Sequence, residues 1–452
     1  MSQHPTPSPD TPTPDPAADA PTQARMPEVC VRSILALALP ALGVLAAAPL
    51  YLLLDTAVVG RLGAAALAAL AAGTTIQGVV TTQLTFLSYG TTARASRLYG
   101  AGDRPGAVAE GVQATFVACG VGLVLMTIIE LGAGRFTLWL AHDPDVAQLA
   151  GSWLRVAGIG IPLILCTMAG NGWLRGVQNT RLPLYFTLAG VVPSAVLVPV
   201  LVSHVGIVGS AWANLVGETI TAVCFLVCLA REHQGTWRPD TRIMGRQLVL
   251  GRDLIIRSLS FQVALLSAAA VAGRFGAAAL GAHQVLLQLW NFLALSLDSL
   301  AIAAQALTGA ALGAASASAA QRTGWTITKF SAGLGVCLAA LLALGYQLIP
   351  RIFTTDDTVL ADMRAVWPLL VVMVLLGGVV FALDGVLLGA SDAAFLRTAT
   401  VASVLLGFLP GVWLAWVTDS GLVGVWCGLV AMMVLRLVAV TVRFHRGRWA
   451  QN

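Results

Sequence analysis

One aspartate interrupts a long apolar stretch near the start of the chain. Asp55 lies in the run Leu-Leu-Leu-Asp-Thr-Ala-Val-Val, Tyr51 precedes it by four positions, and Pro40 precedes it by fifteen. A spacing of four places the phenol and the carboxyl on one face of a helix, and an internal proline can bend that helix. Because a carboxyl away from water is disfavoured in its charged form, we expect Asp55 to take up and release a proton. The alternative is an aspartate at a helix end that reaches interfacial water.

Other polar side chains also stand in apolar stretches. Glu218 and Asp298 lie within such runs, and a carboxylate inside a bilayer costs about 3 kcal/mol or more, so both should face the protein interior. Each could act in transport or hold neighbouring helices together. Glu130 falls at the outer end of another run, where we expect it to be solvated. A polar stripe at helical spacing could line a cavity or join helices by hydrogen bonds, and it consists of Gln284, Gln288 and Asn291.

Membrane-spanning helices must position these side chains. The chain has 452 residues, of which 57% are hydrophobic and 10% charged, against roughly 25% charged in an average soluble domain. Apolar stretches recur that can cross roughly 30 Å of hydrocarbon, and backbone groups in a bilayer must be satisfied within a helix. We predict twelve spans, at residues 33–59, 65–92, 107–131, 148–172, 182–203, 206–231, 251–273, 279–305, 323–349, 362–388, 395–418 and 421–443.

The composition excludes several classes of protein. The only lysine, Lys329, follows a threonine, so the sequence contains no Gly-Lys-Ser/Thr loop for ATP. The seven cysteines form no Cys-x-x-Cys pair and have no histidine at ligand spacing, so we expect no metal and no cofactor. Paired catalytic carboxylates and a Ser-His constellation are missing, so we expect no enzyme. The net charge of +5 is spread out, so we expect no nucleic-acid partner.

Arginine placement predicts the topology. Arginines concentrate after the second, fourth and sixth stretches and near the C-terminus, which predicts that both termini lie in the cytoplasm. We expect the chain in a bacterial cytoplasmic (inner) membrane. Residues 1–28 hold eight of the 20 prolines and no aromatic residue, so we expect a disordered cytoplasmic tail. We predict an N-terminal lobe at 29–231, a cytoplasmic linker at 232–250 and a C-terminal lobe at 251–452. We expect a monomer in the lipid bilayer.

The chain repeats itself at an offset of 213 residues. Residues 58–69 and 271–282 share nine of twelve positions, including Gly-Arg-x-Gly, and residues 171–179 align with 384–392 at the same offset. Six helices per half is an even number, so the halves form a parallel repeat. The predicted fold is an all-α membrane protein with twelve transmembrane helices in two six-helix lobes. We expect a structural loop motif formed by Asn171, Arg175, Asn179, Asp384 and Asp392.

The order of these motifs resembles the multidrug and toxic compound extrusion (MATE) family, in particular its prokaryotic DinF-like branch. The resemblance covers residues 33–445 and rests on Pro40 with Asp55 and on residues 90–103, 171–176, 282–285, 298–305 and 384–392. It implies a secondary active antiporter that exports organic, cationic or amphipathic compounds by alternating access in exchange for H⁺ or Na⁺. Asp55 then resembles the acid whose protonation accompanies bending of the first helix at Pro40, and Tyr51 resembles its neighbour in the pocket.

The chain departs from this family in its fifth helix. Members commonly carry an Asn and an Asp four positions apart, where this chain has Ser194 and Val198. A sodium site requires several oxygen ligands, so the departure favours H⁺ as the coupling ion, with Ser194 in the cavity lining. The competing hypothesis is a flippase for lipid-linked precursors from the same superfamily. Its cavity would need arginines or lysines to bind pyrophosphate, whereas the expected interior here is acidic.

Overall fold

The computed structural model describes residues 30–141 and 143–450, and these residues form helices and no strand. The predicted tail at residues 1–28 lies outside this part of the chain. The first lobe consists of α1 (Val31–Val59), α2 (Ala64–Gln83), α3 (Phe86–Gly100), α4 (Arg104–Ala141), α5 (Pro144–Ile159), α6 (Ile161–Gly176), α7 (Arg181–Val205) and α8 (Ile207–Glu232). The second consists of α9 (Thr241–Arg274), α10 (Ala277–Gly313), α11 (Ala317–Leu344), α12 (Ile349–Phe353), α13 (Asp357–Gly389), α14 (Ala393–Ser403), α15 (Leu409–Val417) and α16 (Gly421–His445).

The predicted number of spans is confirmed. Eleven helical segments among the described residues are long and apolar enough to cross a membrane, and α5 with α6, bent by 45° at their junction, makes a twelfth. Several bounds differ from the prediction. Helix α4 continues to Ala141 and α9 begins at Thr241, each about ten residues beyond the apolar stretch, whereas α11 already ends at Leu344. The prediction that Glu130 lies at a helix end is therefore wrong, because α4 runs well past it.

The backbone confirms the internal repeat. The starts of α2 and α10, of α4 and α11, and of α5 and α13 are each separated by 213 residues. Residues with positive φ, which mark helix-ending turns, recur at the same offset in four pairs: Gly63 and Gly276, Gly102 and Ala315, Gln178 and Ser391, and Gly206 and Asp419. The two halves thus share their turns as well as their helices.

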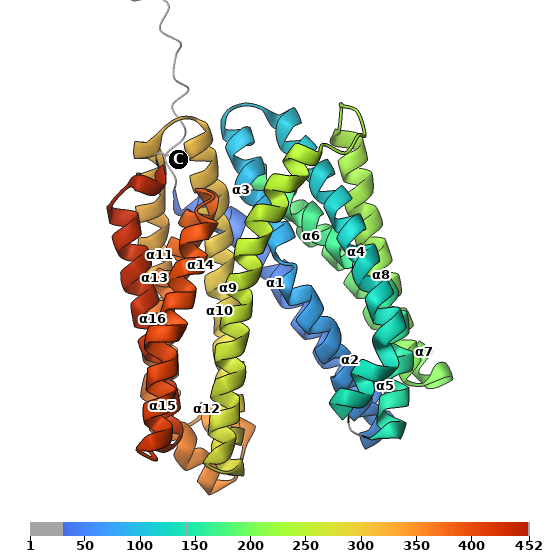
Figure 1. Cartoon of the computed structure of the whole chain (residues 1–452), viewed down its shortest axis with the longest axis vertical. Coiled ribbons are helices and arrows are strands. Elements are labelled where there is room, and N and C mark those ends of the chain that lie inside the picture. Colours follow the sequence, from blue (N-terminus) through green and yellow to red (C-terminus); the bar gives the residue numbers. More distant parts are fainter. Residues whose placement is uncertain (1–29, 142, 451–452) are drawn as a thin grey trace, which may run out of the picture.

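The two lobes meet at one end and separate at the other. Figure 1 shows the lobe of α1–α8 (blue to green) beside that of α9–α16 (yellow to red), closest at the upper end, where the C-terminus lies. There α3 packs against α10 at small residues, because a Cβ placed on Gly100 would overlap the carbonyl oxygen of Ala310. Small residues at helix contacts allow such close backbone approach. The contact between the lobes is therefore a tight helix–helix packing.

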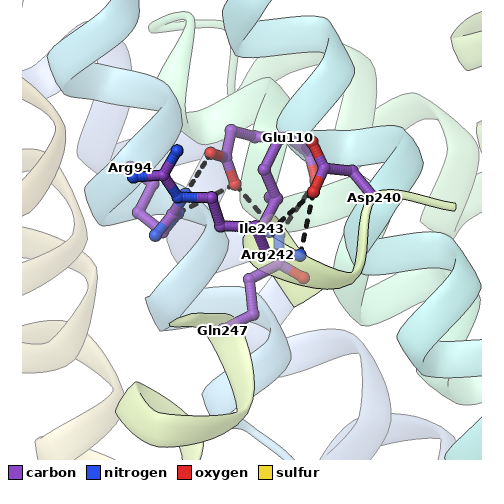
Figure 2. A network of polar contacts seen from close by, with 6 residues as sticks. All are labelled: Arg94, Glu110, Asp240, Arg242, Ile243 and Gln247. Carbon is purple, nitrogen blue, oxygen red and sulfur yellow. Dashed lines mark hydrogen bonds and ion pairs between the residues drawn. The ribbon is translucent and has the colours of Figure 1, made fainter. Parts of the chain in front are cut away.

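Helix α9 connects the lobes. In Figure 1 it starts beside the first lobe and runs down to the far end of the second. Figure 2 shows its first turns on the first lobe: Glu110 accepts from Arg94 Nε at 2.8 Å and from Gln247 Nε2 at 3.0 Å. Six residues after Gln247, the Asp253 carboxylate pairs with Arg397 of α14 in the second lobe at 2.6 Å. The predicted linker at 232–250 is thus partly helical and fixed to the first lobe.

The outer faces of the helices are apolar. Leu131, Trp139 and Leu344 expose 83%, 78% and 86% of their surface. Soluble monomers rarely expose large contiguous apolar patches, whereas a bilayer covers such a surface. Inside the second lobe, large buried rings such as Trp367 and Trp426 fill the space between helices. The lobes are therefore packed inside and suited to lipid outside.

Candidate functional site

The first lobe contains a cavity of about 490 Å³. Helices α1, α2, α5, α6, α7 and α8 enclose it, so it lies within one lobe. Most of its lining is apolar. The side chains that give it chemistry are Tyr51, Asp55, Gln77, Asn171, Ser194, Asn214 and Glu218. Four of the residues that the sequence suggested for a cavity, Tyr51, Asp55, Ser194 and Glu218, therefore share one site.

Asp55 is held on one side only. Its side chain is 2% exposed, and its Oδ2 accepts a hydrogen bond from Ser210 Oγ at 2.7 Å. The Ser210 oxygen in turn accepts from Trp153 Nε1 at 3.2 Å, which fixes its orientation. Asp55 Oδ1 is buried and has no hydrogen-bond partner among the described residues. A buried carboxylate oxygen in this position is costly unless it gains a proton or a cation.

Helix α1 places this carboxyl in the cavity. Tyr51 lies one turn before Asp55 and also lines the cavity, and its buried hydroxyl has no partner among the described residues. The helix contains Pro40 and also Pro49, which the sequence analysis did not consider. Each proline lacks an N–H for the helical ladder. The segment that carries the acid is thus a helix with two interrupted hydrogen-bond positions.

Glu218 supplies a second carboxyl from α8. Asn214, one turn earlier, donates its Nδ2 to Glu218 Oε1 at 2.7 Å. The other oxygen, Oε2, is buried without a partner among the described residues. It lies against the bend between α5 and α6, where a Cβ on Gly160 would overlap it. A residue with a side chain at this bend would displace the carboxyl.

The charged side chains of the cavity lining are all acidic. All of its lining residues are described, and they include two carboxyls and no arginine, lysine or histidine. Asn171 adds an amide oxygen that is buried without a partner among the described residues. Ser194 lines the cavity, and its hydroxyl donates to the carbonyl oxygen of Ala213 at 2.7 Å. The site can therefore offer negative charge and hydrogen-bond acceptors to a ligand.

The polar stripe of α10 lies elsewhere. Gln284, Gln288 and Asn291 are exposed, and none forms a side-chain hydrogen bond with another described residue. Asp298 lies on the same face of α10, seven positions after Asn291, and it accepts from the hydroxyl of Tyr89 in α3 at 2.8 Å. This face therefore points towards the first lobe. The stripe lines the space between the lobes where they separate.

Asp298 belongs to the contact between the lobes. Asp298 is bonded to the hydroxyl of Tyr89. Gln305, two turns further along α10, donates its Nε2 to the backbone carbonyl of the same Tyr89 at 2.6 Å. Arg97 adds a hydrogen bond from its Nη2 to the carbonyl of Ala390 at 2.8 Å. These polar bonds cross between the lobes at the end where α3 and α10 pack closely.

Three members of the predicted loop motif lie in the last two turns of helices, just before the loops themselves. Asn171 and Arg175 are in α6, and buried Arg175 donates to Ser88 Oγ at 3.1 Å. Asp384 is in α13 and pairs with Arg257 of α9 at 2.7 Å and with Arg436 of α16. The arginines are far away in the sequence, so local spacing could not reveal that Asp384 joins three helices.

The other two members do lie at helix ends. Asn179 Oδ1 accepts from the backbone N–H of Leu182 at 3.2 Å, in the first turn of α7. Asp392 Oδ2 accepts from Arg443 Nε of α16 at 2.7 Å. Both side chains fix the turn that follows their helix, in the two halves of the repeat.

The second lobe lacks the acids at the corresponding positions. Adding 213 to the numbers of Tyr51, Asp55 and Glu218 gives alanines in each case, at 264, 268 and 431. Three smaller or unbranched residues of the cavity lining, Ala48, Gln77 and Met168, correspond to Phe261, Trp290 and Phe381. The rings of Trp290 and Phe381 contact each other, with centroids 6.2 Å apart. This comparison uses only the repeat, so the sequence contained the signal that assigns the chemistry to one lobe.

Comparison with known proteins agrees with the fold. A family model described as MatE matches residues 40–200 and 254–413. The chain is 30% identical over 423 residues to Protein DETOXIFICATION 44, chloroplastic, of Arabidopsis thaliana. This alignment covers 90% of this chain and 80% of the relative. It is 28% identical over 434 residues to DNA damage-inducible protein F of Escherichia coli, covering 91% and 92%. A crystal structure of MATE in the bent conformation superposes with a TM-score of 0.85 at 21% identity, covering 92% and 94%.

Proposed function

The chain belongs to the MatE family of multidrug and toxin efflux transporters, and on that premise we propose that it is an antiporter that exports organic cations in exchange for H⁺. It is not an enzyme, as its relatives are transporters. The observation that carries the proposal is the cavity of about 490 Å³ with two carboxyls and no basic side chain in its lining. A cavity of this size and mostly apolar lining suits a small organic molecule, and the carboxyls favour a cationic one.

Asp55 is the proposed site of the coupling proton. Its carboxyl is almost fully buried, and one oxygen is bonded to Ser210 while the other has no partner among the described residues. When the cavity is open to the outside, the ionised carboxyl attracts the cation. Protonation then removes this attraction and releases the compound. Because Asp55 stands on α1 with Pro40 and Pro49, a change in its charge can be followed by repacking of that helix.

Glu218 is proposed to recognise the positive charge of the compound. It reaches the same cavity from α8, and it has one oxygen without a partner among the described residues. Its neighbour Asn214 fixes the other oxygen. Gln77, Asn171 and the hydroxyl of Tyr51 would orient polar parts of the compound. Apolar lining residues such as Leu52, Ile164 and Met168 would hold its hydrocarbon.

Coupling to H⁺ is proposed over Na⁺. Sodium and similar hard cations are bound by several oxygen ligands close together. Members of the family commonly carry a second acid in the fifth membrane span, which is α7 in this chain, and Val198 occupies that position. A single buried carboxyl is sufficient for a proton.

The flippase hypothesis receives less support. A pyrophosphate would need guanidinium or ammonium groups in the cavity, and the lining of the first-lobe cavity has none. In the second lobe, the half-buried Arg257 and the buried Arg436 are already paired with Asp384. We therefore favour cations as the transported class.

The protein spans the membrane many times. We also propose in which membrane it lies, how it is oriented there and in what oligomeric state it acts. We propose a bacterial cytoplasmic membrane, in which the arginine-rich loops would place both termini in the cytoplasm. In that orientation the lobes meet at the cytoplasmic end and separate towards the outside. One chain encloses the entire cavity, so we propose that the monomer is the transporting unit.

Reconstitution in liposomes tests the proposal. Movement of cationic dyes and of neutral metabolites of similar size would be measured under an imposed pH gradient or an imposed sodium gradient. We expect cations to be exported when H⁺ enters, with little transport under sodium alone. Robust sodium-driven export without a pH gradient would contradict proton coupling. Movement of lipid-linked precursors without dye transport would favour the flippase.

A further inference from the structure

A second cavity lies at the end of the second lobe that carries the C-terminus. Its volume is about 280 Å³, and it opens on the outer side of α16 between that helix and the start of α14. It does not belong to the transport cavity described above, which lies in the other lobe. Its lining is divided between apolar and basic side chains: Phe395, Val438, Ala439 and Val442, and the arginines Arg443, Arg446 and Arg448.

The turn that carries two of these arginines is fixed by a buried tryptophan. Trp449 is fully buried, stacks on Phe444 with ring centroids 5.4 Å apart, and donates its Nε1 to the carbonyl of Phe444 at 2.9 Å. Gly447 has φ +66°, which permits the chain to turn back on α16. The backbone at Arg446 and Arg448, on either side of it, is thus fixed before any ligand arrives.

The positive charge of this second cavity, an open groove along α16, is not balanced within the described structure. Arg443 is neutralised by Asp392, at 2.7 Å, and its guanidinium lies over the ring of Phe395 at 5.1 Å. Arg446 and Arg448 are exposed and form no ion pair with any residue in the described ranges. Two free guanidinium groups therefore converge on one apolar groove.

The groove also crosses the boundary of the membrane. Val438 and Val442 are one turn apart on α16 and expose 54% and 43% of their surface. Helix α16 is one of the membrane spans, so these valines face acyl chains. Arg446 follows one further turn along the same line. The surface thus passes from apolar to basic in the direction from the hydrocarbon to the headgroups.

We propose that this groove binds an anionic phospholipid of the adjoining leaflet, with its phosphate between Arg446 and Arg448 and an acyl chain along Val438 and Val442. Guanidinium groups bind phosphate oxygens through paired hydrogen bonds. Basic pockets at this depth in membrane proteins select anionic headgroups. The site is independent of the proposed transport activity. It would secure the C-terminal end of the second lobe to the bilayer.

Lipid binding by the purified full-length protein tests this assignment. Native mass spectrometry would compare phosphatidylglycerol with phosphatidylcholine of the same acyl chains. We expect the wild-type chain to prefer phosphatidylglycerol. An arginine near an anionic lipid surface contributes about 1 kcal/mol, so we expect the phosphatidylglycerol affinity to fall about fivefold in R446Q and about thirtyfold in R446Q/R448Q.

Matched controls separate the groove from general surface charge. R242Q/R246Q removes two other exposed arginines, at the start of α9, and should retain the preference for phosphatidylglycerol. Equal binding of both lipids to the wild type, or an unchanged preference in R446Q/R448Q, would overturn the proposal. Inorganic phosphate, added at the lipid concentration, should not displace the lipid. Complete displacement would identify free phosphate as the occupant and would also overturn it.

Discussion

Replacement of Asp55 by Asn is the sharpest test of proton coupling. The amide has nearly the size of the carboxyl and keeps an oxygen that can accept from Ser210, whose Oγ lies 2.7 Å from Asp55 Oδ2. The fold should therefore be preserved. The side chain can no longer gain or lose a proton in the physiological range. We expect D55N to accumulate in membranes as well as the wild type and to lose export driven by a pH gradient.

The size of the effect depends on the charge of the compound. For a monovalent cation exchanged for one proton, the charges cancel, so one pH unit supports a gradient of about tenfold. For a neutral compound exchanged for one proton, about 100 mV and one pH unit together supply about 3.7 kcal/mol, or a gradient of about five-hundredfold. In D55N both gradients should fall to one. The ratio between the two compound classes also reports whether the exchange moves net charge.

The assay uses proteoliposomes with a fluorescent organic cation and an imposed pH gradient, with and without a membrane potential. Asp357 provides a matched control, because its carboxyl is exposed in the first turn of α13 and outside the cavity. D357N should transport as the wild type does. Export by D55N at wild-type rates would refute the role of Asp55. Loss of export in both variants would show that the assay reports general damage.

Three further variants test other parts of the structure. Glu218→Gln keeps a hydrogen-bonding side chain but removes a charge, so the KM for cations should rise about tenfold or more while that for neutral compounds stays constant in the same liposome assay. Tyr89→Phe removes the bond to Asp298 between the lobes, worth about 1.5–3 kcal/mol, so spin labels across the closed end should report about a tenfold or larger shift towards separated lobes. Gly100→Ala introduces a Cβ where a backbone carbonyl of α10 lies and should lower the thermal midpoint, whereas Gly134→Ala, where nothing lies within 4 Å, should not. An unchanged label distance or an unchanged midpoint would contradict the packing described between the lobes.

The architecture could be predicted because its signals are local or repeated. Hydropathy predicts the helices, and the offset of 213 residues predicts two similar halves. The repeat extends to backbone turns such as Gln178 and Ser391, both with φ 60°. Helix bounds were less accurate. Hydropathy follows the hydrocarbon core, whereas α9 begins ten residues before its predicted span with polar residues such as Arg242, Arg246 and Gln247.

The site was predicted in part for the same reason. Asp55 and Tyr51 are neighbours on one helix, so their spacing predicts their shared position. The contacts that define each acid come from distant residues, as Ser210 does for Asp55. The ion pair of Asp384 with Arg257 could not be predicted, because Arg257 lies 127 residues away along the chain. Such contacts depend on how the helices pack, which a single sequence does not reveal. Asn214 stands one turn before Glu218, and this spacing is a local signal that could have predicted their hydrogen bond.

The attachment of α9 to both lobes restricts where the molecule can bend. Gln247 is bonded to Glu110 on one side, and Asp253 is paired with Arg397 on the other, with only five residues between them. Any rotation of one half relative to the other must therefore be absorbed within less than two helical turns. Gly251 sits in this short span, pressed against the ring of Phe86. The connection between the halves thus acts as a rigid hinge. A flexible linker would transmit far less of a movement that begins at α1.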